Sequence, residues 1–176
     1  MRGHLRGWLA GCARVTGPEY LISHRWALAS RFAVTDETGA PQFEVRGRFA
    51  LSKTLSVCDA TETEVAVITR QGGLGRCYQI LAGGQEVTVS ARGFLGSRYE
   101  IDSPGGLLEA RGDFSGRQYS ITRDGTPAAA VTQSRPPREQ FAVQVTPGQD
   151  AVLMLAVVLA IETIRDNRRR AAVASS

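Results

Sequence analysis

Apolar and polar residues alternate with a period of two along most of the chain. Between residues 20 and 145, pairs of apolar side chains are separated by a single intervening residue, as in Phe32/Val34. Successive side chains of a β-strand point to opposite faces, so each pair predicts the buried face of a half-exposed strand. With a further strand at residues 20–23, the pattern predicts twelve strands. The other predicted buried sets are Phe43/Val45, Leu55/Val57, Val65/Val67, Tyr78/Ile80, Val87/Val89, Tyr99/Ile101, Leu108/Ala110, Tyr119/Ile121, Ala129/Val131 and Phe141/Val143/Val145.

Turn-forming residues separate the predicted strands. Residues 36–39, 59–62, 82–85, 103–106 and 123–125 contain the Asp, Gly and Pro that tight hairpin turns require. The first buried residue of each hairpin recurs at positions 32, 55, 78, 99, 119 and 141, and only Leu55 among them is not aromatic. A hairpin repeated in this way predicts an antiparallel β-meander. Twelve meandering strands are most stable as a closed barrel, which has no exposed edges.

A hydrophobic segment near the C-terminus is expected to fill that barrel. A barrel of twelve strands has an interior too wide for its own side chains to fill. Residues 151–161 form an apolar run of eleven residues, shorter than the roughly 20 needed to cross a bilayer. The run is apolar on all sides, which is typical of a helix surrounded by protein. We therefore expect all-β architecture with one buried helix at 150–167 along the barrel axis.

The two ends of the chain differ from the expected barrel at 19–167. Residues 1–18 show neither strand nor helix period and predict a loose N-terminal extension, and residues 168–176 predict a basic, small-residue tail. The sequence Leu9-Ala10-Gly11-Cys12 resembles a lipoprotein cleavage box. Its apolar segment is shorter than the roughly 7–15 residues of an export signal, so an ordinary extension is the favoured interpretation.

Composition places the chain among ordinary globular proteins. Its 176 residues are 43% hydrophobic and 22% charged, which excludes disordered and collagen-like classes. Three cysteines without a CxxC pair provide neither a disulfide framework nor a zinc site, so we expect reduced thiols and a cytoplasmic protein.

Residues with catalytic potential are sparse. The two histidines are His4 and His24, so a nucleophile has few bases to activate it. Cys58 and Cys77 fall on outward-facing positions of separate strands, and residues 72–75 resemble a turn rather than a phosphate-binding loop. The sequence predicts no enzyme activity, no metal and no cofactor.

Several of these motifs, in this order, resemble a known family. The motifs are Phe32-x-Val34-x-Asp36-x-x-Gly39, Phe43-x-Val45-x-Gly47, Leu55-x-Val57-x-Asp59, Gly112-Asp113, and Pro147-Gly148 followed by Asp150-Ala-Val-Leu. Together with the terminal helix, they resemble the LURP-one-related branch of the tubby C-terminal-like superfamily over residues 20–170. Phospholipid scramblases are more distant relatives. The resemblance implies a barrel around a central helix and a non-catalytic protein. No lipid-contact or calcium-binding residue of these relatives matches a position in this sequence.

Charge is expected to differ between the two ends of the barrel. The net charge is +4, but residues 32–161 hold more carboxylates than basic side chains, which argues against a specific nucleic-acid surface. In a meander, alternate connections lie at opposite ends. Acidic residues then gather at the hairpin turns, and basic residues gather at the other end, where the helix finishes.

One hypothesis is that this basic end meets an anionic surface, namely acidic phospholipid headgroups at the periphery of a membrane. The candidate anion-binding residues are Arg46, Arg48, Lys53, Arg70, Arg165, Arg168, Arg169 and Arg170. Alternatives remain open: the arginines serve only solubility, and the protein is a scaffold or protein-interaction module without lipid binding. A small-molecule carrier would need a cavity inside the barrel, and weak nucleic-acid binding by the tail would show steep salt dependence.

Overall fold

Twelve strands and one helix make up the computed structural model of the chain, which describes residues 15–25, 30–47, 54–93, 97–133 and 140–175. The strands are β1 (Glu19–His24), β2 (Ser30–Asp36), β3 (Pro41–Gly47), β4 (Thr54–Asp59), β5 (Glu64–Gln71), β6 (Cys77–Ala82), β7 (Gln85–Arg92), β8 (Arg98–Ser103), β9 (Gly106–Asp113), β10 (Gln118–Arg123), β11 (Thr126–Gln133) and β12 (Gln140–Val145). The helix, α1, spans Ala151–Ala174.

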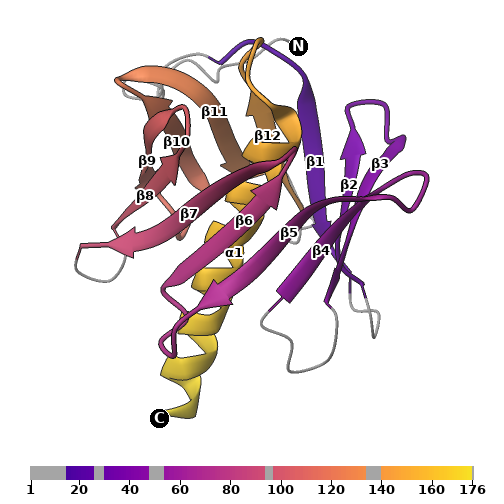
Figure 1. Cartoon of the computed structure of the whole chain (residues 1–176). Coiled ribbons are helices and arrows are strands. Elements are labelled where there is room, and N and C mark those ends of the chain that lie inside the picture. The colour runs from indigo at the N-terminus through magenta and orange to yellow at the C-terminus, as the bar shows by residue number, and fades with distance from the viewer. Residues whose placement is uncertain (1–14, 26–29, 48–53, 94–96, 134–139, 176) are drawn as a thin grey trace, which may run out of the picture.

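The strands form one closed antiparallel barrel in chain order (Figure 1). Each strand pairs with the next along the chain, and β1 closes the barrel by pairing with β12 as well as with β2. The predicted twelve-stranded meander and its closure are therefore confirmed. Because the order is sequential, the connections alternate between the two ends of the barrel.

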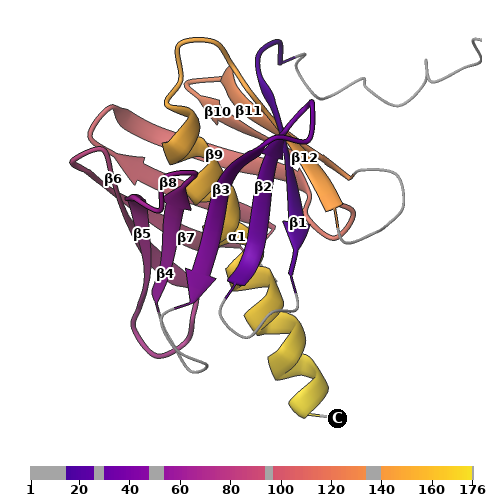
Figure 2. The same ribbon diagram turned by 90° about the vertical axis from the view of Figure 1, so that its right-hand side faces the viewer.

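Helix α1 runs through the barrel, and its C-terminal part projects beyond the strands (Figures 1 and 2). Asp150 caps its first turn by accepting a hydrogen bond from the backbone N–H of Leu153 at 3.1 Å. Every residue from Leu153 to Arg165 is buried, which confirms the expected central helix. The helix continues seven residues past the predicted end at 167, so most of the predicted tail is helical. Arginine and alanine, which dominate that segment, both favour helices.

The predicted buried face is correct for most strands and wrong for β5. Ala66 and Ile68 are 2% and 0% exposed and face the core, whereas Val65 and Val67 are only half-buried. The pairing of β4 with β5 shifts register at Val57, which sets Leu55 opposite Ile68. A one-residue shift turns every later side chain of a strand to its other face. Because this run is apolar on both faces, alternation alone does not identify the inner one.

The segment before β1 is bound to the barrel rather than loose throughout. Val15 is 7% exposed, and the carbonyl of Pro18 accepts a hydrogen bond from the N–H of Val145 at 3.0 Å. The side-chain amide of Gln144 also donates to the carbonyl of Gly17. The expectation of a loose extension is therefore wrong for residues 15–18. Residues 1–14, with the cleavage-box sequence, lie outside the described residues.

Gly112 permits a close contact between β9 and β10. It has a φ of +140°, and a Cβ at this position would lie 2.5 Å from the carbonyl oxygen of Gln118 and 2.6 Å from the Cα of Tyr119. Any larger residue would push the two strands apart. This steric requirement explains the glycine in the Gly112-Asp113 motif.

The barrel has two distinct ends. We call the end where α1 emerges the helix end; strands β1, β3, β5, β7, β9 and β11 finish there. The opposite, hairpin end holds the tight turns and the start of α1, where the Asp150 carboxylate lies beside Gly83. No helix in the described part of the chain is long and apolar enough to span a membrane.

Candidate functional site

At the helix end, Arg25 and three further arginines are exposed and form no ion pair with any described residue; the three are Arg76, Arg169 and Arg170. Arg76 ends the β5–β6 connection, and the other two lie on the projecting part of α1. Strand β6, which directly follows Arg76, contacts α1: the side-chain amide of Asn167 donates a hydrogen bond to the Tyr78 hydroxyl at 2.8 Å. These cations therefore share one end of the molecule.

The other predicted anion-binding residues have different environments. Arg48 and Lys53 lie outside the described residues. Arg46 binds two carboxylates, Glu44 at 2.7 Å and Glu62 at 3.1 Å, and both contacts raise the pKa of its guanidinium. Arg70 donates to the carbonyl of Gly73 in the adjacent turn. Arg168 is half-buried.

Arg165 is not a surface residue, contrary to the sequence-based expectation. It is 8% exposed, and its guanidinium donates to Glu162 at 2.5 Å and to the carbonyl of Ser115 at 3.4 Å. Glu162, 1% exposed, also accepts a hydrogen bond from Arg117 at 3.0 Å. A buried charge is costly without a partner, so Glu162 holds both arginines inside the barrel mouth.

Arg117 enters this cluster from the β9–β10 connection. It has a φ of +52°, its guanidinium carbon lies 4.7 Å from the centre of the Phe141 ring, and it donates to the side-chain oxygen of Gln133 at 3.4 Å. Arg117 and Glu162 are 45 residues apart in the sequence. Local patterns do not reveal such a pair; the only local signal is a carboxylate at the end of an apolar helix.

Two tyrosines line the barrel near this cluster. Burial raises the pKa of the Tyr99 phenol, and the positive charges of Arg168 and Arg165 partly oppose that shift. Burial also raises the pKa of the Tyr119 phenol well above its ordinary value. Both groups are therefore neutral phenols at physiological pH. They add hydrogen-bonding capacity but no charge to the helix end.

Among the described residues, the two most exposed large apolar side chains also lie at the helix end. Leu74, in the β5–β6 connection, is 87% exposed, and Val173, near the end of α1, is 78% exposed. A Cβ on Gly75 would lie 3.6 Å from the side-chain nitrogen of Asn167, so the Leu74 turn rests against the helix. These two apolar side chains therefore share the helix end with the exposed cations.

Three shallow depressions at the helix end are lined by arginines. One of about 420 Å³ is lined by Ser115, Gly116, Arg117, Gln133 and Arg169. A second, of about 390 Å³, includes Arg76 and Arg92, and a third, of about 430 Å³, includes Arg98 and Arg111. Arg92, Arg98 and Arg111 already pair with Glu100 or Glu109.

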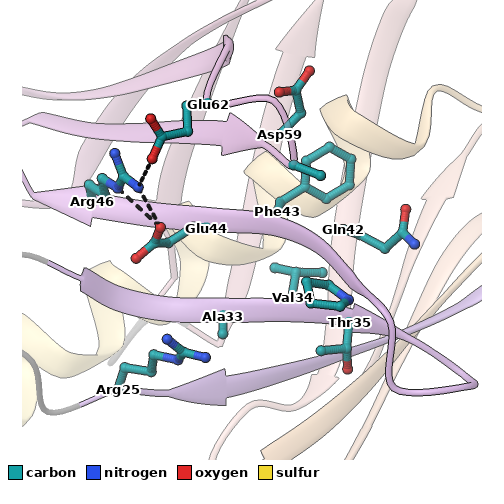
Figure 3. A pocket seen from close by; sticks show the side chains of 12 residues that line it. Arg25, Ala33, Val34, Thr35, Gln42, Phe43, Glu44, Arg46, Asp59 and Glu62 are labelled. Carbon is teal, nitrogen blue, oxygen red and sulfur yellow. Dashed lines mark hydrogen bonds and ion pairs between the residues drawn. The ribbon is translucent and has the colours of Figure 1, made fainter.

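A fourth depression lies on the outer wall of β2 and β3 (Figure 3). It has a volume of about 250 Å³, and Phe43 forms part of its floor. Its Arg46 is already paired with Glu44 and Glu62, as the dashed lines in Figure 3 show. None of these four depressions is lined by Leu153–Arg165, the buried part of α1.

The described residues contain no group of three metal-ligating side chains. Cys58 and Cys77 are free thiols, and burial raises the pKa of Cys58, which makes it a poor nucleophile.

The sequence matches the family profile described as LURP-one-related over residues 20–162. The chain belongs to the LURP-one-related family. The match begins in β1 and ends within the buried part of α1, so it includes the barrel and its central helix. No curated protein matches the sequence significantly.

The LURP-one-related fold is also seen in a crystal structure of an Arabidopsis thaliana protein. The two share 16% sequence identity with a TM-score of 0.66, over 86% of this chain and 93% of the plant protein. At that identity the similarity concerns the fold. The helix-end arginines must therefore be judged on their own geometry.

Proposed function

We propose that this protein is a non-catalytic barrel that docks on anionic phospholipid surfaces with its helix end. One observation carries the proposal: Arg76, Arg169 and Arg170, which have no ion pairs among the described residues, occupy the same end as Leu74 and Val173. Each basic residue near an anionic surface contributes on the order of 1 kcal/mol. The two apolar side chains add contact with the interfacial region once the surface is reached.

Charge at the opposite end supports one direction of approach. The hairpin turns carry the half-buried Asp36 and Asp59 and the exposed Glu37, Glu62 and Asp124, which an anionic surface repels. The molecule would therefore approach with its helix end forward. The paired arginines Arg92, Arg98 and Arg111 contribute less, since Glu100 and Glu109 offset their charge.

Vesicle co-sedimentation of the full chain tests the proposal. We expect recovery with phosphatidylcholine/phosphatidylserine vesicles at low salt, little recovery with phosphatidylcholine alone, and loss as salt rises. Arg76→Gln and Arg170→Gln should each weaken binding about fivefold, which corresponds to about 1 kcal/mol. Arg123→Gln, at the hairpin end, removes the same charge and is the matched control.

Equal recovery with neutral and anionic vesicles at low salt would contradict lipid docking. The barrel would then be better explained as a scaffold or protein-interaction module, with its specificity in the connections between strands.

A further inference from the structure

The depression beside Arg117 combines an arginine that is held in place with one that is exposed. Its described lining residues include two arginines, Arg117 and Arg169, and, like those of the other two depressions, no carboxylate. Arg169 is exposed and forms no ion pair with a described residue. By contrast, the arginines of the 430 Å³ depression, Arg98 and Arg111, both contact Glu109. The Arg117 depression, like the 390 Å³ depression with Arg76, therefore holds one unpaired arginine, whereas the 430 Å³ depression holds none.

The buried cluster behind it fixes one of these cations in place. Arg117 is 8% exposed and is held by Glu162, Gln133 and the Phe141 ring. Glu162 divides one negative charge between Arg117 and Arg165. An arginine positioned in advance loses little side-chain entropy when it binds an anion. The fixed Arg117 and the exposed Arg169 can then both contact one bound anion.

The other lining residues of the depression are uncharged. They are Ser115 and Gly116 of the β9–β10 connection and Gln133 at the end of β11. The nearby Asp113 carboxylate accepts a hydrogen bond from the N–H of Gly116 at 2.9 Å and does not line the depression. The volume of about 420 Å³ lies within the range of small-ligand sites.

We propose that this depression, lined by Ser115, Gly116, Arg117, Gln133 and Arg169, binds a phosphomonoester. Guanidinium groups pair well with phosphate, because two parallel N–H donors match two phosphate oxygens. A monoester carries more negative charge and more free oxygens than a diester, so it gains more from two arginines. As a lipid-headgroup site the inference rests on the proposed membrane docking, whereas a soluble phosphate compound would bind the same residues without it.

The first experiment uses a soluble probe and the full chain. We expect glycerol 3-phosphate, a monoester, to bind in a calorimetric titration more tightly than dimethyl phosphate, a diester. Arg169→Gln should weaken this binding at least fivefold. Arg170→Gln, which removes the same charge one residue further along the same exposed helix, should change it less than twofold. Arg169→Lys should give an intermediate loss, since lysine keeps the charge but not the paired donors.

The second experiment separates the two sources of the phosphate. Vesicles containing phosphatidic acid are compared with phosphatidylserine vesicles of matched surface charge. If the phosphate belongs to a lipid, phosphatidic acid binds more tightly, and Arg169→Gln removes that preference while Arg170→Gln preserves it. If glycerol 3-phosphate binds but no vesicle does, the site takes a free phosphate compound, and the membrane proposal fails alone.

Two results would overturn the phosphomonoester site. One is no difference between glycerol 3-phosphate and dimethyl phosphate. The other is an equal effect of Arg169→Gln and Arg170→Gln on probe binding. If vesicles still bound in either case, the proposed membrane docking would stand as a diffuse electrostatic contact without a phosphomonoester site. Urea unfolding of each variant confirms that these substitutions of exposed residues leave the barrel intact.

Discussion

Position 162 introduces a carboxylate where the preceding residues of the buried helix are apolar. We expect Glu162→Gln to lower the free energy of unfolding by about 3–5 kcal/mol, because it leaves Arg117 and Arg165 buried without their carboxylate. Arg165→Met should cost less, since the Arg117–Glu162 pair remains. Urea denaturation of the wild type and both variants measures the difference. A larger loss in Arg165→Met than in Glu162→Gln would contradict this account.

Single-residue roles were the least predictable part of the molecule. Arg165 belongs to a charged C-terminal stretch, and charged residues are seldom fully buried unless paired. Its burial depends on Glu162 one turn earlier and on the carbonyl of Ser115 from another connection. The exposed Arg169 and Arg170 were predicted as candidates, but whether they bind anions remains a prediction.

Two successive hairpin turns have the same hydrogen-bonding arrangement. The Asp36 carboxylate accepts from the N–H and hydroxyl of Thr38 at 2.9 and 2.6 Å, and Asp59 accepts from the N–H and hydroxyl of Thr61 at 2.8 and 2.7 Å. The side-chain hydrogen bond from Thr38 or Thr61 is the largest cause that lowers the pKa of each aspartate. The ionised form thus stabilises each turn.

These lowered pKa values predict how stability changes in acid. A lowered pKa in the folded state means that stability is present at neutral pH and is lost as the pH falls below the ordinary aspartate range. The double variant Asp36→Asn/Asp59→Asn should lose less stability than the wild type between pH 6 and pH 3, because asparagine accepts hydrogen bonds without titrating. Urea unfolding across this range measures the slope. Equally steep slopes in both proteins would contradict the role of the turns.

The central helix makes the barrel intolerant of a charge in its interior. Val158 is 0% exposed, and Val158→Asp would bury a carboxylate without a partner. We expect the variant to unfold or to lose its cooperative thermal transition by circular dichroism. Val173→Asp, on the exposed part of the same helix, is the control and should melt like the wild type. An unchanged melt for Val158→Asp would mean that the helix does not fill the barrel in solution.

Elements were more predictable than residues because their patterns are long and repeated. The alternation identified all twelve strands, and an apolar run that needs protein on every side identified the helix. The inner face of β5 was not predictable, since Val65, Ala66, Val67 and Ile68 are all apolar and a register shift decides between them. The end of α1 was missed because its last turns are polar and exposed, yet composed of helix-forming residues.

For the whole molecule, the meander topology allowed the two ends to be distinguished from sequence. Sequential order places alternate connections at the same end, so residues far apart in the chain gather without any direct signal of contact. The structure adds that Arg46 reaches Glu62, a residue of a hairpin turn. Because this contact joins a basic residue of β3 to a carboxylate of the hairpin end, the separation of positive and negative charge between the two ends is weaker at β3 than the turn positions alone suggested.

If docking is led by the helix end, the two ends of the bound molecule should differ in environment. An environment-sensitive fluorophore is attached to Ser175→Cys, at the end of α1, or to Ala40→Cys, at the hairpin end, in a chain with Cys12→Ser and Cys77→Ser. Cys58 is buried and reacts slowly. With anionic vesicles we expect a blue-shifted emission at position 175 and an unchanged emission at position 40. Equal shifts at both positions would mean that the barrel binds on its side, where Leu74 and Val173 do not lead the contact.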